Sequence, residues 1–194
     1  MEKIKLSYQH NCSVPSDINE HLPTLLKYSN ECKHITEMGV RWVCSTWALL
    51  MSDAEKIISY DIRKDESVNP LISAAEEYGI NFQFIEADVL NLEIEKTDLL
   101  FIDTLHTYNQ LTKELELHSK NVSTYIILHD TESFAYNDEF IYEHASEFVK
   151  SSSPSKQGLW NAVVDFLETE QGSHWVVFDR YRNNNGLTVL KRVN

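Results

Sequence analysis

The sequence predicts an α/β domain in which helices cover both faces of a mostly parallel β-sheet. Short apolar segments alternate with amphipathic stretches along the chain, which is typical of strands connected by helices. The apolar segments are nearly continuous, as in strands that are buried on both faces. Near the end, two apolar segments are separated by residues 183–186, Asn-Asn-Asn-Gly, which is a hairpin signal.

Seven strands follow from these apolar segments. Five are predicted to run parallel, at residues 34–38, 56–61, 81–87, 99–102 and 125–128, and two closing strands lie at 175–178 and 187–190. The pattern predicts a Rossmann-like three-layer sandwich with a mostly parallel seven-stranded sheet and a C-terminal antiparallel hairpin. A chain of 194 residues suits one domain with one core, so residues 1–194 are expected to form a single domain.

Helices are predicted between the strands by apolar spacing and by start and stop residues. They comprise a helical extension within residues 1–30, and helices at 45–51, 67–79, from 108 onward, around 140–149 and at 159–167. His118 and His144 fall within two of these helices and are expected to be structural or to face solvent. Five aromatic residues have core spacing and are expected to be buried: Phe140, Phe148, Trp160, Trp175 and Phe178.

Composition argues against several classes of partner. There are 17 Lys and Arg residues against 30 Asp and Glu, a formal net charge of −13, and no concentrated basic patch, so nucleic acid is not expected to bind. No apolar run approaches the roughly 20 residues of a membrane helix, so no membrane is expected either. The N-terminal residues lack a secretion signal and the three cysteines lack paired spacing, which favours a cytoplasmic location. A homo-oligomer is left open.

Polar residues stand where successive predicted strands end. Glu37, Asp61, Asp88 and Asp103 close or directly follow the first four, and His129-Asp130 ends the fifth. In open parallel sheets, ligands bind beyond the carboxyl ends of the strands, so these residues predict a ligand site. The other interpretation is that they are ordinary polar loop residues, which is harder to reconcile with a carboxylate at successive strand ends.

The spacing also indicates the kind of ligand. Asp61 follows Gly39 by about twenty residues, where an acid accepts hydrogen bonds from ribose hydroxyls in dinucleotide-binding folds. Residues 37–45 contain a single glycine and lack the G-x-G-x-x-G pattern. This argues against NAD or FAD, and a dehydrogenase is the least favoured function.

At these residues the chain resembles a known family. A first strand followed by Glu37-x-Gly39, then Asp61, Glu86-Ala87-Asp88 and Asp103 at the next three strand ends, resembles the motif series of class I S-adenosylmethionine-dependent methyltransferases over residues 30–192. Residues 103–108 and 129–131 are similar to a narrower branch, which contains small-molecule O-methyltransferases and the proteins named cephalosporin hydroxylases.

The resemblance implies a binding site for S-adenosylmethionine. The turn at Glu37 and Gly39 would pass its methionine part, with Ser45 beside the methionine carboxylate. Asp61 would hold the ribose, and Asp88 with Val89 would border the adenine. One departure is that Val43 stands where the family has a second glycine, and its side chain is expected to crowd the cofactor.

The resemblance further implies a metal site and a base. Asp103, His129 and Asp130 match positions that bind a divalent cation in some members, so Mg²⁺ or Mn²⁺ is a second candidate cofactor. His129 stands where the family often has an acid, so the sequence leaves undecided whether Mg²⁺ binds there. His106 and Asp103 are the catalytic candidates, because a general base must accept the proton of the attacking hydroxyl.

The predicted function is methyl transfer from S-adenosylmethionine to a hydroxyl of a small molecule, such as a sugar or another natural product. Residues 131–157 would form a lid over this acceptor. The alternative is a domain that binds S-adenosylmethionine or S-adenosylhomocysteine without catalysis.

Overall fold

The sheet has seven strands in the order β3-β2-β1-β4-β5-β7-β6. The structure is a computed structural model that describes residues 1–153 and 155–193. The strands are β1 (His34–Met38), β2 (Lys56–Asp61), β3 (Phe82–Glu86), β4 (Thr97–Ile102), β5 (Val122–His129), β6 (Trp175–Tyr181) and β7 (Leu187–Arg192). Neighbouring strands are parallel from β3 to β5, and β7 pairs antiparallel with both β5 and β6. The predicted fold class is confirmed.

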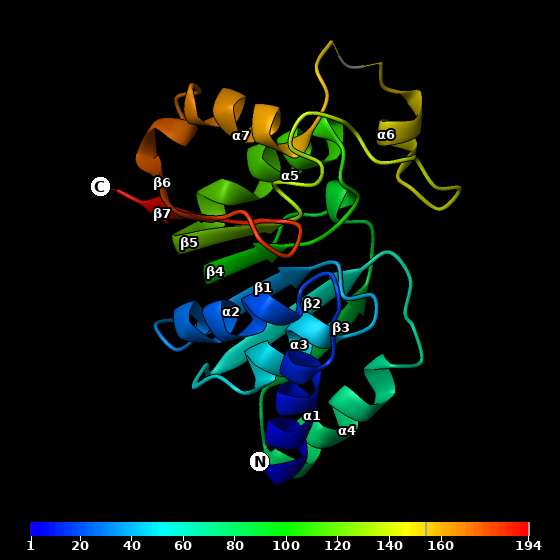
Figure 1. Cartoon of the computed structure of the whole chain (residues 1–194), viewed down its shortest axis with the longest axis vertical. Helices are drawn as coiled ribbons and strands as arrows, with labels where there is room; N and C mark the ends of the chain where they lie inside the picture. Colours follow the sequence, from blue (N-terminus) through cyan, green and yellow to red (C-terminus); the bar gives the residue numbers. More distant parts are fainter. Residues whose placement is uncertain (154, 194) are drawn as a thin grey trace.

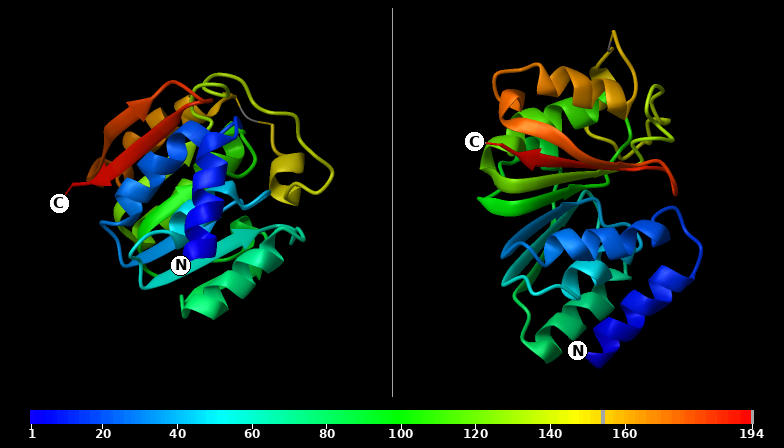
Figure 2. Two further views of the ribbon diagram at one scale, coloured as in Figure 1. Left: turned by 60° about the horizontal axis from the view of Figure 1, so that its bottom comes forward. Right: turned by 60° about the vertical axis from the view of Figure 1, so that its left-hand side comes forward.

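Helices cover both faces of this sheet (Figures 1 and 2). One side carries α1 (Glu2–Ser13), α2 (Leu22–Ser29), α3 (Cys44–Leu50) and α4 (Val68–Tyr78), and the other carries α5 (Tyr108–His118) and α7 (Leu159–Leu167). The short α6 (Glu147–Ser151) stands away from the sheet at the edge of the molecule (Figure 1). Each layer of helices closes its own hydrophobic cluster against the sheet.

Strand β5 shows why the apolar segments read as continuous. Tyr125 and Ile127 pack into the cluster on the α2 and α3 side, whereas Ile126 and Leu128 pack into the cluster under α5 and α7. Successive side chains of a strand point to opposite faces, and all four are at most 2% exposed. Because both faces are covered, no polar alternation is needed.

The strand order reverses between β1 and β4, and Gly39 sits at this point. Its φ is +85°, and a Cβ built on it would lie 1.9 Å from the backbone oxygen of Asp103. Only glycine can adopt this conformation in so little space without strain. The loops that follow β1 and β4 are therefore held in direct contact, at the place where open α/β sheets bind ligands.

The prediction of a helix around residues 140–149 is wrong for residues 140–146. Only Glu147–Ser151 is helical, and His144 lies in a turn rather than a helix. The acids before it bond elsewhere: Asp138 accepts from the backbone N–H of Tyr108, and Glu139 accepts from that of His106. Side chains that bond backbone groups of other segments compete with local helix formation.

The burial predicted for five aromatic residues holds only in part. Trp175 is 3% exposed and belongs to the core under α5 and α7, and Trp160 packs against that core. Phe140 is 79% exposed, Phe178 49% and Phe148 44%, so their predicted burial is wrong. Phe178 lies on β6, which ends the sheet, and Phe140 lies in the irregular segment after β5.

Within residues 1–153 and 155–193, the helices are all too short or too polar to cross a membrane.

Candidate functional site

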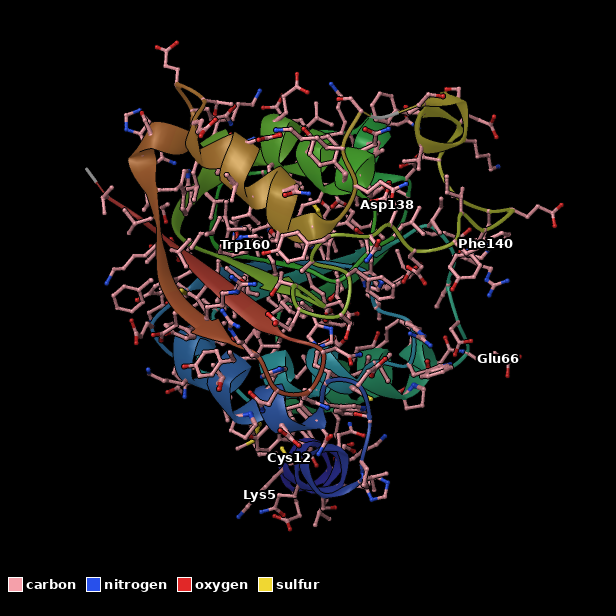
Figure 3. The ribbon with its side chains drawn as sticks, turned by 45° about the horizontal axis from the view of Figure 1, so that its top comes forward. Lys5, Cys12, Glu66, Asp138, Phe140 and Trp160 are labelled. Atoms are coloured by element: carbon pink, nitrogen blue, oxygen red, sulfur yellow. The ribbon has the colours of Figure 1, made fainter. Side chains whose placement is uncertain are left out.

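A cavity of about 450 Å³ opens at the carboxyl ends of the parallel strands. This volume falls within the range of small-molecule and cofactor sites. Six residues singled out from the sequence line it: Gly39, Asp61, Asp88, Val89, Asp103 and His106. Its outer walls come from the β2–α4 loop and from the segment after β5, marked in Figure 3 by Glu66 and Phe140, which neighbour lining residues.

Asp61 ends β2 and fixes the loop that follows β1. Its Oδ2 accepts from the backbone N–H of Val40 at 2.8 Å and of Arg41 at 3.1 Å, and its Oδ1 accepts from that of Arg63 at 3.1 Å. A carboxylate offers about four acceptor positions. Asp61 therefore holds the loop, and these three bonds leave one of its acceptor positions unused.

Asp88 has a similar double role beyond β3. Its Oδ1 accepts from the backbone N–H of Leu90 at 2.9 Å, capping a short 3₁₀ turn, and its Oδ2 accepts from the Asn91 side chain at 2.9 Å. Each oxygen retains one acceptor position. Val89 beside it is 6% exposed and gives the cavity an apolar wall.

Glu37 and Ser45 lie beneath the cavity rather than along its wall. Glu37 is fully buried and accepts hydroxyl hydrogen bonds from Ser45 (2.6 Å), Thr46 (2.9 Å) and Ser59 (2.5 Å). Burial raises the pKa of Glu37 to about 7, although the three hydroxyls favour its charged form. These bonds join β1, β2 and α3, so Glu37 fixes the floor of the site.

Val43 does not reach the cavity. Its backbone is left-handed, with a φ of 63°, which a β-branched residue adopts only under strain. Its side chain is 5% exposed and packs into the core against α1–α4, and it is absent from the described residues that line the cavity. The expectation that Val43 crowds the cofactor is therefore wrong, because the left-handed turn directs the side chain into the core.

A cluster of two acids and two histidines occupies the ends of β4 and β5. His106 Nε2 lies 3.3 Å from Asp103 Oδ1 and 2.9 Å from Asp130 Oδ2. His129 Nδ1 lies 3.3 Å from each of the same two oxygens. The His129 ring also packs edge-on against the ring of His21, with 5.7 Å between the ring centroids. Two imidazoles thus face the same pair of carboxylates.

The charges in this cluster stabilise one another. Burial alone would lower the pKa of His106, but Asp103, Asp130 and Glu139 outweigh it and raise the pKa to about 12. Burial also opposes the charge of His129, yet Asp103 and Asp130 raise its pKa to about 10. Burial raises the pKa of both acids, but the two histidines outweigh it, lowering the pKa of Asp103 and bringing that of Asp130 down to about 2. Both imidazoles are therefore protonated at neutral pH.

The sequence analysis did not predict the contacts that four further residues make at the site. Glu139 Oε2 lies 2.8 Å from His106 Nδ1, and Phe134 stacks on the His106 ring at 4.8 Å. Tyr142 donates its hydroxyl to Glu139 Oε1 at 2.6 Å. Glu114 is fully buried beneath the site, which raises its pKa to about 7. Only the position of three of them within residues 131–157 could have drawn attention, because that segment was expected to cover the acceptor.

Comparisons with known proteins establish the fold. No family model matches the sequence, and no curated protein sequence matches it. Among solved structures, an N-methyltransferase, NodS, from Bradyrhizobium japonicum in complex with S-adenosylhomocysteine has a TM-score of 0.61 at 10% identity, covering 98% of this chain and 99% of that one. The 1,6-didemethyltoxoflavin-N1-methyltransferase of Burkholderia thailandensis has a TM-score of 0.61 at 12% identity, covering 100% and 87%.

The 16S rRNA methylase RmtB is similar as well, with a TM-score of 0.54 at 13% identity over 100% of this chain and 75% of that one. The fold is that of class I S-adenosylmethionine-dependent methyltransferases. These three proteins are named for different acceptors, so the shared fold leaves the acceptor of this chain open.

The residues at the ends of β4 and β5 fit a divalent cation. One ligand atom each from Asp103, His129 and Asp130 lies within 4.8 Å of the others. Among the described residues, the buried Asp130 Oδ1 has no hydrogen-bond partner. Two carboxylates with one imidazole suit Mn²⁺ or a related ion better than an all-oxygen site would. The protons that both imidazoles hold would compete with such a cation.

Glu37 should make the stability of the protein fall as the pH rises. The unfolded carboxyl ionises near its ordinary value of 4.5, whereas the folded one holds its proton to about pH 7. Between these values the folded state binds more protons, so the stabilising contribution present at low pH is lost as the pH rises through about 7, by up to about 3 kcal/mol. Urea unfolding of Glu37→Gln at about pH 5 and pH 8 should show a correspondingly smaller loss.

Glu77→Gln, which replaces an exposed carboxyl on α4, is the control and should keep the pH dependence of the natural protein. Parallel pH profiles for Glu37→Gln and the natural protein would contradict this account.

Proposed function

We propose that the protein transfers a methyl group from S-adenosylmethionine to a hydroxyl of a small molecule. The observation that carries the proposal is a single cavity with Asp61 and Asp88 on one side and the Asp103–His106 cluster on the other. In a fold of this class, that arrangement would place hydrogen-bond acceptors for a nucleoside next to groups that can act on a hydroxyl. The fold alone would specify neither the nucleoside nor the hydroxyl.

The donor would lie along the ends of β1 to β3. Gly39 leaves space at the turn after β1, Asp61 has an acceptor position for a ribose hydroxyl, and Asp88 with Val89 borders the place for the adenine. The sulfonium of S-adenosylmethionine is positive, whereas the sulfur of S-adenosylhomocysteine is neutral. Carboxylates along this edge therefore favour the donor over the product.

The acceptor hydroxyl would lie beside Asp103 and His106. A divalent cation held by Asp103, His129 and Asp130 would supply Lewis acidity that lowers the pKa of this hydroxyl. His106 keeps its proton while the carboxylates of Asp103 and Asp130 face its ring. Once these carboxylates are engaged by other groups, the pKa of His106 falls, and the imidazole can accept the proton that the hydroxyl loses.

The acceptor is proposed to be small and hydroxylated, such as a sugar or another natural product, rather than nucleic acid. The net charge of −13 repels phosphate backbones, and the segment after β5 narrows the cavity from above through Tyr142 and His144. Residues 131–153 and 155–157 then act as a lid that excludes water during transfer. Crowding of the cofactor by Val43 would have favoured a domain without catalysis, but the Val43 side chain is buried in the core.

Donor binding can be measured by titration calorimetry with S-adenosylhomocysteine. The natural protein should bind it, and Asp61→Asn should weaken binding by about ten- to a hundredfold, because a hydrogen bond to a charged acceptor contributes about 1.5–3 kcal/mol. Asp98→Asn is a matched control, since Asp98 also accepts from two backbone N–H groups, those of Lys33 and His34, but lies at the opposite end of β4. Failure of the natural protein to bind would refute the donor assignment.

Metal binding can be followed through the unfolding temperature in the presence of Mn²⁺. We expect Mn²⁺ to raise it in the natural protein and in Asp53→Asn, an exposed control, but not in Asp103→Asn. His129 must release its proton to bind, and its pKa is about 10, so the affinity should rise by about tenfold per pH unit below that value. An equal response in Asp103→Asn would rule out this site.

Catalysis can be tested by mass spectrometry of hydroxylated metabolites incubated with S-adenosylmethionine. A mass gain of one methyl group identifies the acceptor. His106→Ala should then lower kcat by about 10²–10⁴-fold, the usual contribution of a general base, whereas the exposed control His174→Ala should not. Full turnover in His106→Ala would refute the base, and donor binding without any product would favour the non-catalytic alternative.

A further inference from the structure

Two consecutive acids fix the segment after β5 to the start of α5. Asp138 Oδ1 accepts from the backbone N–H of Tyr108 at 2.8 Å and of Gly158 at 2.7 Å. The backbone N–H of Glu139 donates to the carbonyl of His106 at 2.9 Å, and Glu139 Oε2 accepts from the backbone N–H of His106 at 3.2 Å. The lid is therefore hydrogen-bonded to the backbone of His106, which is the candidate base.

The same carboxylate also faces the ring of His106. Glu139 Oε2 lies 2.8 Å from Nδ1, whereas Nε2 on the opposite side of the ring faces Asp103 and Asp130. Phe134, from the same segment, stacks on the ring with an interplanar angle of 11°. A carboxylate at Nδ1 fixes the orientation of an imidazole ring. Two of the groups that hold the ring thus belong to the lid.

Beyond Glu139 the segment has few buried contacts. Phe140 is 79% exposed and Tyr142 is 44% exposed, although Tyr142 also lines the cavity and donates to Glu139. Segments with little apolar burial open locally at low free-energy cost. Figure 3 shows Phe140 projecting from this segment at the outer side of the molecule, while Asp138 lies closer to the centre.

From these contacts we infer that Glu139 is a positioning residue that couples the lid to the orientation of His106. With the segment in place, Glu139 holds Nδ1 and directs Nε2 toward Asp103 and Asp130. When the segment opens to admit or release ligands, the ring loses this partner. The importance of His106 orientation for methyl transfer rests on the proposed function, but the coupling itself is a property of the protein alone.

The test compares Glu139→Ala with Glu143→Ala, which removes an exposed carboxyl from the same segment. Hydrogen exchange measured by mass spectrometry reports the opening of residues 134–146. In protein labelled with ¹⁵N-histidine, the Nδ1–H signal of His106, assigned with His106→Gln, reports the ring. Neither measurement needs a methyl donor or a methyl acceptor. Cooperative thermal unfolding verifies that each variant is folded.

Glu139→Ala should speed exchange in this segment by about tenfold or more, because a charge-assisted contact is lost, and should abolish the Nδ1–H signal through exchange with water. Glu143→Ala should change neither. A change in only one of the two measurements, or equal changes in both variants, would overturn the coupling. If Glu139→Ala does not fold, Glu139→Met keeps a similar side-chain length without an oxygen acceptor and carries the same test.

The outcome is separable from that of the proposed function. Failure of the natural protein to bind S-adenosylhomocysteine would refute the donor assignment while leaving the coupling between Glu139 and His106 measurable. Conversely, donor binding with no effect of Glu139→Ala on the lid or the ring would refute only the coupling.

Discussion

The site depends on the contact between the ends of β1 and β4. Gly39 approaches the Asp103 backbone so closely that even one added carbon has no room, and its positive φ turns the chain toward α3. This contact brings the loop after β1 beside the two strand ends that carry the acids and histidines. A side chain there would push the loop after β1 away from the end of β4. The position of the polar side chains at these strand ends thus depends on this contact between two backbone segments.

Charge balance governs the chemistry of the β4 and β5 ends. Buried carboxylates such as Asp130 are tolerated only when cations or hydrogen-bond donors compensate them, and here His106 and His129 supply that charge. Glu139 adds a third carboxylate to His106 from the other side. A cation at Asp103 and Asp130 would take over the compensation and release the imidazoles from it. If a cation binds here, it would therefore compete with the protons held by His106 and His129.

Two acids that the sequence assigns to a cofactor also have structural roles. Asp61 fixes the loop after β1 through three backbone N–H groups, and Glu37 joins β1, β2 and α3 from beneath. A residue that binds a ligand and also holds the surrounding loop keeps the site preorganised before the ligand arrives. It also means that loss of such a residue disturbs both binding and folding.

The sequence by itself determined the strands, their burial on both faces and the edge at which Asp61, Asp88 and Asp103 gather, because hydrophobic period and strand-end position are local properties. Only the tertiary structure decided which way Val43 points, that Glu37 is fully buried, and that residues 140–146 form an irregular segment instead of a helix. Those outcomes depend on partners distant in sequence: Glu139 meets His106 across 33 residues, and Asp61 meets Val40 across 21. No local pattern encodes such pairs, because they form only when separate strand ends share one edge of the sheet.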